Sequence, residues 1–227
     1  MLNHPWDITP REAIALQRQF AGMVRVEPLA APVRWIAGVD CSFVGTWRRE
    51  GRVIAAAVLW DVRRHEVVAR ANYVGACTFP YVPGLLSFRE APAVIEAIGR
   101  LPQRPGVVMI DGQGLAHPRG FGIACHVGVY MDVPTIGVAK SRLCGQHRDP
   151  GPLRGSRRQL MFEGRCIGAV LRTQDNVKPL YVSAGHRVTL AQAIILTLRA
   201  ATHVRLPEPT RWAHHEVTMI KKDFCKS

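Results

Sequence analysis

The apolar and polar positions of residues 9–73 predict one helix followed by three strands. Thr9 can cap a helix, Pro10 suits its first position and Glu12 completes a capping box, so a helix is expected from Pro10 to about Gly22. Strands are expected at 34–44, 52–60 and 65–73, with polar turns at 45–51 and 61–64. Three strands joined by short turns make an antiparallel meander.

The later pattern alternates between helical segments and short apolar runs. The run 107–110 shows no alternation, as expected of a strand buried on both faces, and a glycine-rich loop, 111–122, follows it. Further strands are expected at 134–138, 165–173 and 179–184, and helices at 92–101, from the end of the loop to about Met131, at 190–202 and, as a short one, after the Pro-rich turn 206–210. This order predicts one α/β domain over 1–227, with a mixed sheet (antiparallel meander, then parallel strands) flanked by helices.

Three acidic residues stand out against this pattern. Asp40 ends the apolar run 35–39, Asp111 ends the run 107–110, and Glu90 closes the segment 80–90. An acid at the end of a buried strand is costly unless something balances its charge. The first and fourth strands of the predicted sheet can lie side by side, which would bring Asp40 and Asp111 together. Two or three carboxylates plus substrate phosphate suffice for Mg²⁺, so the pattern indicates magnesium-assisted phosphodiester hydrolysis.

Each acid also has a structural interpretation. Asp40 suits an Asx turn at a strand end, Asp111 a turn before a glycine, and Glu90 a capping box with Ser87. Pro92 weakens the last interpretation, because a proline prefers the first helical position and would leave Glu90 upstream of the helix.

The charge of the chain favours a polyanionic partner. Lys and Arg number 30 against 17 acids, which gives a formal net charge of +13. An excess of this size is typical of nucleic-acid binding, although a solvated basic surface also serves solubility. The basic residues are spread along the chain and are densest at Arg48, Arg49 and Arg52 and over 140–158, so they do not form a disordered tail.

Cysteine usage and hydropathy indicate a cytoplasmic protein. The six cysteines, at 41, 77, 125, 144, 166 and 225, form no Cys-x-x-Cys pair, and their apolar neighbours suit reduced, packed thiols. Residues 1–10 carry no apolar signal core, and the longest apolar run, 53–60, is too short to span a bilayer.

Several segments of the chain together carry a family resemblance. The segments are 38–40, 80–90, 111–119, 133–140, 185–188 and 206–211. In this order they resemble endonuclease V, the deoxyinosine-directed repair nuclease family with an RNase H-like fold. The resemblance covers roughly residues 10–215, and the segment 80–90 is its most specific part. One departure is Gln113, where the family is expected to carry His more often, with altered contacts in the lesion pocket.

The resemblance assigns Asp40, Glu90 and Asp111 to the metal centre, with Mg²⁺ as cofactor and Mn²⁺ expected to substitute. Metal ions there would activate the attacking water and stabilise the leaving 3′ oxygen. His214 matches the histidine after Pro-Thr-Arg and can touch the metal-bound water or a second metal; it can also be a surface histidine. Lys140, as a point charge after a strand, suits the scissile phosphate or the attacking water, or it is a solvated loop charge.

The matched loop 80–84 predicts a wedge. Pro80 and Pro83 fix backbone φ angles around Tyr81, and Gly84 follows. A rigid exposed aromatic ring can stack in a duplex from which a base has been extruded, although Tyr81 can also pack on its own loop.

The loop 111–122 is the candidate lesion reader. Gly112 and Gly114 let the backbone approach a flat base, so that backbone donors and acceptors can read the inosine edge. His117 and Arg119 are expected near the lesion or its phosphate, and His186 is a candidate for supporting the site. Glycines in such a loop also mark plain turns.

The resemblance and the chemistry together predict a magnesium-dependent endodeoxyribonuclease of the deoxyribonuclease V type. The similar enzymes cut the second phosphodiester bond 3′ to deoxyinosine and other deaminated bases in DNA repair, and this chain is expected to do the same. It is expected to act as a monomer and to have no membrane partner. The alternatives are an RNase H-like nuclease for branched or distorted DNA and a non-catalytic basic DNA-binding module; the module is disfavoured because it would not need three like charges together. Cleavage of inosine-containing RNA, the lesion range, the number of metals and the downstream repair partners stay open.

Overall fold

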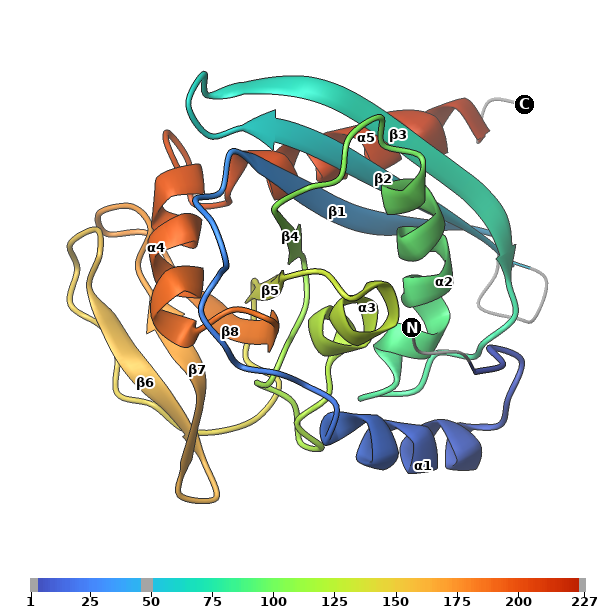
Figure 1. Ribbon diagram of the computed structural model, residues 1–227, viewed down its shortest axis with the longest axis horizontal. Coiled ribbons are helices and arrows are strands. Elements are labelled where there is room, and N and C mark those ends of the chain that lie inside the picture. The colour runs from blue at the N-terminus through green and yellow to red at the C-terminus, as the bar shows by residue number, and fades with distance from the viewer. Residues whose placement is uncertain (1–3, 46–50, 225–227) are drawn as a thin grey trace.

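An eight-stranded mixed sheet organises the chain in the computed structural model, which describes residues 4–45 and 51–224 (Figure 1). The predictions that concern Arg48, Arg49 and Cys225 lie outside the described residues. The strand order is β3-β2-β1-β4-β5-β8-β7-β6. The strands are β1 (Trp35–Val44), β2 (Gly51–Asp61), β3 (Glu66–Cys77), β4 (Val107–Ile110), β5 (Thr135–Ala139), β6 (Arg157–Phe162), β7 (Arg165–Leu171) and β8 (Leu180–His186). The helices are α1 (Pro10–Ala21), α2 (Leu86–Gly99), α3 (Ile123–Met131), α4 (Leu190–Ala200) and α5 (Glu208–Phe224).

Strand β1 joins the antiparallel meander to the parallel strands β4 and β5, whereas β8, β7 and β6 beyond them pair in the antiparallel sense and not in the parallel sense that the sequence predicted for the later strands. It pairs with β2 in the antiparallel sense over its whole length and with β4 in the parallel sense. The parallel register sets Val39 beside Ile110, so the next residues, Asp40 and Asp111, follow at neighbouring positions. The predicted meander and the predicted pairing of the first and fourth strands are therefore confirmed.

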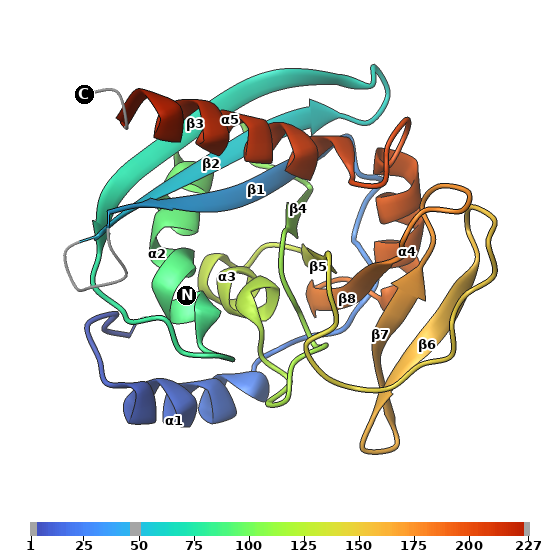
Figure 2. The same cartoon turned by 180° about the vertical axis from the view of Figure 1, so that it is seen from behind.

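Helices cover both faces of the sheet, and the alternation along the strands decides which residue faces which layer. Ala37, Val39, Val108 and Ile110 pack in one core cluster with residues of α2 and α3, whereas Ile36, at the opposite phase of β1, packs in a second cluster with residues of α4. Helix α2 lies in front of the sheet in Figure 1, and α5 lies in front of it when the molecule is seen from behind in Figure 2.

Gly38 brings α5 unusually close to β1. A Cβ atom at this position would lie 2.0 Å from the carbonyl carbon of Pro209 and 2.3 Å from the backbone nitrogen of Thr210. Residues i and i+2 of a strand point to the same face, so Asp40 faces α5 as well. The first turn of α5 is thus seated on the backbone of β1 next to the acid.

Helix α2 begins earlier than the sequence predicted. Leu85 is its N-cap and makes no side-chain cap, Ser87 Oγ has no hydrogen-bond partner among the described residues, and Pro92 lies inside the helix. Both the capping box with Ser87 and the expectation that Glu90 lies upstream of the helix are therefore wrong. Phe88, like later residues at helical spacing, is buried, and this packing outweighs the missing Pro92 N–H bond.

Two elements near the C-terminus differ from expectation. Strand β6 was not predicted, because its first three residues, Arg157–Arg158–Gln159, are exposed and polar at the edge of the sheet. Helix α5 was expected to be short but spans 17 residues, and its buried positions, among them Ala213 and Val217, recur at helical spacing among charged ones. The helix start at Thr9 and Pro10, including the capping box with Glu12, is confirmed.

The described cysteines are free thiols, in agreement with the expected reduced state. Within residues 4–45 and 51–224, none of the helices combines the length and the apolar character that crossing a bilayer requires.

Candidate active site

Asp40 lies within β1, which continues to Val44, so the Asx turn at a strand end is not what holds it. Its side chain is 13% exposed, and the two oxygens have different partners. Oδ1 accepts a hydrogen bond of 2.9 Å from the N–H of Cys41, and Oδ2 lies 2.7 Å from Nδ1 of His214 on α5. Burial and the neighbouring charge of Asp111 raise the pKa of Asp40, while the bond to His214 opposes that rise.

Asp111 and Lys140 meet at the carboxyl ends of β4 and β5. Lys140 Nζ lies 2.5 Å from Oδ2 of Asp111. The backbone around Lys140 is held by two further side chains: Arg205 donates to the Lys140 carbonyl at 2.9 Å, and Gln113 Nε2 donates to the Ser141 carbonyl at 2.9 Å. Gln113, which stands where a histidine was expected, thus anchors the segment that carries Lys140.

Glu90 reaches the same site from α2. Burial of its carboxyl group, followed by the charges of Asp40 and Asp111, raises the pKa of Glu90 to about 8. The same charges act on Cys41, whose thiol pKa is raised well above its ordinary value by burial and then by Glu90 and Asp40. The structure therefore brings the three predicted acids within electrostatic reach of one another.

The three carboxylates do not converge on a single point. Among the described residues, no three His, Cys, Asp or Glu side chains stand close enough together, as they lie, to hold one metal ion. The Asp40 carboxylate is turned to His214 and the Asp111 carboxylate to Lys140. The donor set nevertheless consists of hard oxygen atoms, and Mg²⁺ commonly binds through one or two carboxylates with water and phosphate completing its shell.

Two pockets flank the loop that carries Tyr81. One, of about 400 Å³, is lined by residues including Asp111, Gly112, Gln113 and Lys140, and the other, of about 380 Å³, by residues including Cys41, Phe43, Arg89 and Glu90. Tyr81 and Leu86 line both, so they form the partition between the two pockets. The larger one is within the size range of small-ligand sites.

The wedge candidate is exposed and its loop is firmly anchored. The Tyr81 residue is 56% exposed, and Pro80 and Pro83 are also exposed. Gly84 adopts a positive φ of 78°, and its carbonyl oxygen accepts from three side chains: Arg119 at 2.7 Å, Gln17 at 3.0 Å and the ring of His117 at 3.0 Å.

His117 and Arg119 therefore support the wedge loop. Nδ1 of His117 accepts from the N–H of Arg119 at 3.1 Å, which leaves Nε2 to donate to Gly84, and burial lowers the pKa of His117 to about 4. Arg119 Nε donates to Gln17 at 2.6 Å. His117 still lines the larger pocket, but Arg119 is not among its lining residues. Arg119, which was expected near the lesion or its phosphate, contacts the Gly84 carbonyl and Gln17 in this structure.

The two glycines of the loop 111–122 have different surroundings. Gly112 lines the larger pocket, as a reader of a flat base requires. Gly114 is buried against β8: its N–H donates to Ser183 Oγ at 2.9 Å, and a Cβ would lie 2.1 Å from the Ala184 carbonyl oxygen. Gly114 was expected to offer its backbone to a base, but that donor is already used and the glycine permits sheet packing.

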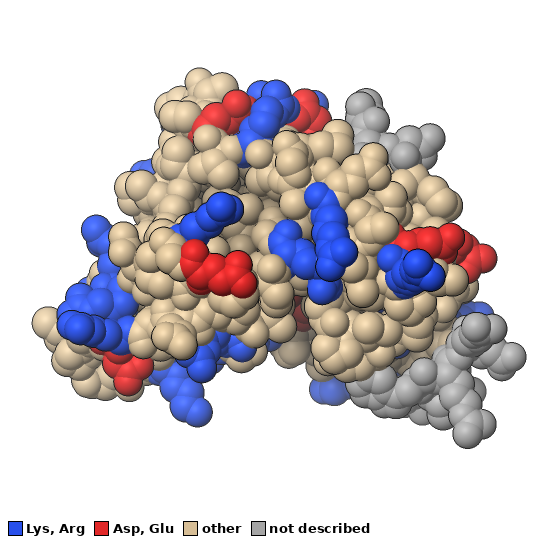
Figure 3. Space-filling view, turned by 90° about the horizontal axis from the view of Figure 1, so that it is seen from below, with Lys and Arg blue, Asp and Glu red and all other residues tan. Residues whose placement is uncertain are grey.

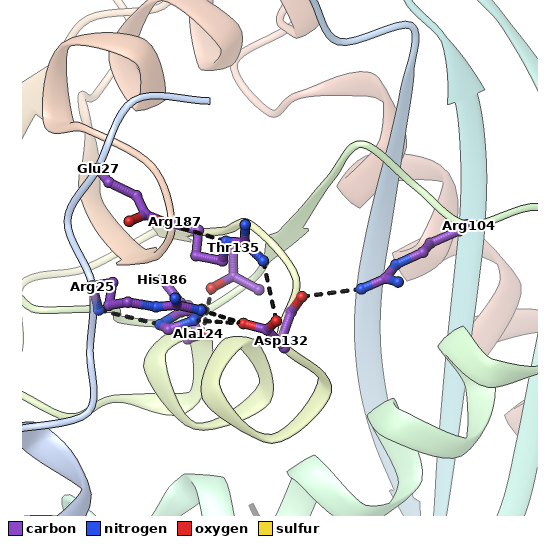
Figure 4. A network of polar contacts seen from close by, with 8 residues as sticks. All are labelled: Arg25, Glu27, Arg104, Ala124, Asp132, Thr135, His186 and Arg187. Carbon is purple, nitrogen blue, oxygen red and sulfur yellow. Dashed lines mark hydrogen bonds and ion pairs between the residues drawn. The ribbon is translucent and has the colours of Figure 1, made fainter. Parts of the chain in front are cut away.

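His186 is the last residue of β8. It pairs with Thr135 at the start of β5, whereas Lys140 follows the opposite end of that strand. Its ring contacts the Asp132 carboxylate at 3.4 Å, and the same carboxylate binds Arg25 at 2.6 Å and Arg187 at 3.1 Å (Figure 4). Asp132 caps α3 in a left-handed conformation with φ 49°. His186 thus helps to fasten the N-terminal segment to the sheet and does not face the acids.

The sequence motifs did not reveal Arg205 or Gln17. Arg205 adjoins the matched segment 206–211 and donates to both the Lys140 and the Pro179 carbonyls. Gln17 lies in α1 outside the main motifs and donates to the Gly84 and Phe121 carbonyls. Their targets are backbone oxygens, which no sequence pattern specifies.

The mixed sheet flanked by helices makes this an α/β protein, and the acids at the junction of β1 and β4 are of the kind that metal-assisted hydrolysis uses. The family model described as Endonuclease V matches residues 18–215. The endonuclease V of Azotobacter vinelandii is 49% identical over 208 residues, which cover 92% of this chain and 93% of that protein. The chain belongs to the endonuclease V family, and the predicted family, fold class and nuclease activity are confirmed.

Solved structures agree with this assignment. The crystal structure of endonuclease V from Streptomyces avermitilis superposes with a TM-score of 0.91 at 42% identity, covering 99% of this chain and 98% of that one. Endonuclease V of Ciona intestinalis, in complex with DNA containing an inosine followed by a ribo-adenosine, shares the fold with a TM-score of 0.79 at 22% identity, covering 94% and 98% of the two chains.

Proposed function

We propose that this chain repairs deaminated DNA by nicking the second phosphodiester bond on the 3′ side of deoxyinosine, in a reaction assisted by Mg²⁺. One observation carries the proposal. The parallel register of β1 and β4 sets Asp40 beside Asp111, and Asp111 opens into a pocket walled by Tyr81. Membership of the endonuclease V family supports a nuclease, and this arrangement supports its division into a lesion pocket and a cleavage centre.

Asp40, Glu90 and Asp111 would hold the metal. Their all-oxygen donor set suits a hard divalent cation. Burial, followed by the charges of Asp40 and Asp111, raises the pKa of Glu90, and a bound cation would offset that repulsion. When bound, Mg²⁺ or Mn²⁺ supplies a charge that activates water and stabilises the leaving 3′ oxygen. Glu90 would hold the metal in its ionised form, so binding of the cation would release the proton that the raised pKa retains.

The other residues of the site position charge and substrate. Lys140, fixed through its carbonyl by Arg205, places an ammonium group beside Asp111, where a scissile phosphate would lie. His214 faces the oxygen of Asp40 that the Cys41 N–H does not bind, so it fixes the orientation of that carboxylate. Its ring can accept or donate a proton at the edge of the site.

The pockets on either side of Tyr81 account for the offset between lesion and cut. An extruded hypoxanthine would enter the pocket beside Gly112, while Tyr81 stacks on the opened duplex. The strand would then run past Asp111 and Lys140, which also line this pocket, and past the partition formed by Tyr81 and Leu86 toward Glu90. The broken bond therefore lies away from the recognised base, and the lesion remains in the nicked strand.

One assay tests the proposal. A duplex with a single deoxyinosine and an end label on the lesion strand is incubated with the protein in magnesium or in chelator, and a duplex with deoxyadenosine at the same position is the control. We expect one nick at the second bond 3′ to inosine, dependent on the metal. Cleavage of both duplexes alike, a cut elsewhere, or full activity in chelator would refute the proposal.

A further inference from the structure

The segment that follows Lys140 and leads to strand β7 is strongly basic. Residues 141–165 contain six arginines and two acids, Asp149 and Glu163. They comprise the loop after Lys140, the edge strand β6 and the turn into β7, and we call them the basic arm. In Figure 3 the molecule is seen from the α1 side, and Lys and Arg side chains gather at the end formed by β6 and β7 as well as around a central hollow.

The arginines of the basic arm fall into two groups. Arg154 is committed to the fold, because its guanidinium donates to the Thr173 and Ala201 carbonyls at 3.0 Å and to the Leu198 carbonyl at 2.7 Å. The other five, Arg142, Arg148, Arg157, Arg158 and Arg165, are exposed, and none of them forms an ion pair with an acid of the described residues. Their charge is not used to stabilise the fold.

The basic arm continues directly from the lesion pocket. Arg142 and Leu143 line that pocket together with Asp111. Farther along, Gln146 and Met161 exchange two backbone hydrogen bonds, of 2.7 and 2.9 Å, which fasten the loop to β6. The arm is thus a fixed extension of the pocket rim.

We propose that the basic arm holds the phosphate backbone of duplex DNA on one side of the lesion; the choice of DNA rests on the proposed function. Arg157 and Arg165 mark the two ends of β6, since Arg165 pairs with Phe162. Six strand residues span about 20 Å. This length corresponds to about six base pairs, along which each strand offers a phosphate every 3.4 Å or so.

Exposed guanidinium groups at such spacing bind phosphate oxygens without reading sequence. The arm therefore adds sequence-independent affinity and orients the duplex relative to the pocket. Charged residues on an edge strand also discourage pairing with another sheet, and the experiment below separates the two roles.

The experiment measures binding of a long, undamaged duplex by the full chain as a function of salt. The double variant Arg157→Gln with Arg165→Gln removes two charges from the basic arm. The double variant Arg63→Gln with Arg64→Gln removes two from the turn between β2 and β3, next to the other edge of the sheet, and is the control for the lost charge; Arg64 there pairs with Glu66 at 3.3 Å. Thermal unfolding confirms that each variant is folded.

We expect the slope of log affinity against log salt to fall by about 2 for the basic-arm variant, because each lost phosphate contact contributes about 0.9. Its affinity at about 0.1 M salt should drop at least tenfold or so, whereas the control should lose clearly less in both quantities. Equal changes in the two variants, or an unchanged slope, would overturn the proposal and leave the arm to an acidic protein partner. Self-association of the basic-arm variant with an unchanged slope would show that the arginines protect the edge strand. Undamaged duplex is used so that these outcomes do not depend on inosine cleavage.

Discussion

Replacing Glu90 by glutamine removes a charge from the site while keeping the shape of the side chain. The pKa of Glu90 is raised from 4.5 to about 8 in the folded protein, so the folded state holds the proton more tightly than the unfolded state does. Stability from this group is therefore complete below about pH 4.5 and is lost as the pH rises through about 8. In Glu90→Gln the loss does not occur, and the variant should be more stable than the parent above pH 4.5.

The magnitude follows from the gap between the two pKa values. At 1.36 kcal/mol per pH unit, the raised pKa of Glu90 costs about 3 kcal/mol of folding free energy at neutral pH and less than about 1 kcal/mol at pH 5, because the folded protein keeps a proton that the unfolded chain releases. These are upper bounds, because relaxation and water entry reduce the cost. For a chain of this length, each kcal/mol corresponds to about 2–4 °C in melting temperature. Glu90→Gln should thus melt up to about 6–12 °C higher at neutral pH in chelator.

The assay is thermal unfolding of both proteins in chelator, at about pH 5 and pH 7, with Glu96→Gln as control. Glu96 lies exposed on the same helix, so its substitution should not produce a pH-dependent gain. Magnesium should then stabilise the parent, by about 2.7 kcal/mol at a concentration 100 times its dissociation constant, and should stabilise Glu90→Gln less. A gain that is the same at both pH values, or no gain, would refute the electrostatic reasoning.

Three further predictions concern the site. Asp40→Ala and Asp111→Ala should abolish nicking of inosine duplex but preserve the fold and much of the binding in a gel-shift assay; near-normal cutting by either variant contradicts the metal assignment. Tyr81→Ala should weaken binding of inosine duplex by about 1–3 kcal/mol and of single-stranded inosine DNA by less, and an equal loss on both would show that the ring positions the strand. Arg205→Met frees the Lys140 carbonyl, so the cleavage rate at saturating DNA should fall while affinity changes little; a loss confined to affinity would exclude this positioning role.

Much of the fold could be predicted because local signals agreed with packing. The capping box at Thr9 and the uniformly apolar run of β4 specify their elements almost alone. The start of α2 could not be predicted, because Pro92 imitates the first residue of a helix and the burial that overrides it depends on distant strands. Strand β6 was missed for a related reason. It is held by pairing with β7 along one side, and its exposed polar residues give no apolar pattern from which a strand could be predicted.

The acids of the site were accessible from sequence, and their supports were not. Asp40 and Asp111 follow from two strands whose register the sheet confirms, while Glu90 was singled out at the end of the segment 80–90 and then assigned to the metal centre by the family resemblance. Arg119 matched a motif, yet its guanidinium serves the Gly84 carbonyl, and such a contact between a side chain and a remote backbone oxygen leaves no trace in spacing.

Gly38 controls the geometry of the site because only a hydrogen atom fits between its Cα and the first turn of α5. Its close approach to Pro209 seats α5, and the same helix carries His214 to Asp40 across 174 positions of sequence. Even a methyl group at residue 38 would push α5 away from β1 and so move His214 away from Asp40, although neither of these two residues would have been changed. Residue 38 has no catalytic group of its own, but its lack of a side chain sets the distance between β1 and α5 and therefore the contact between Asp40 and His214.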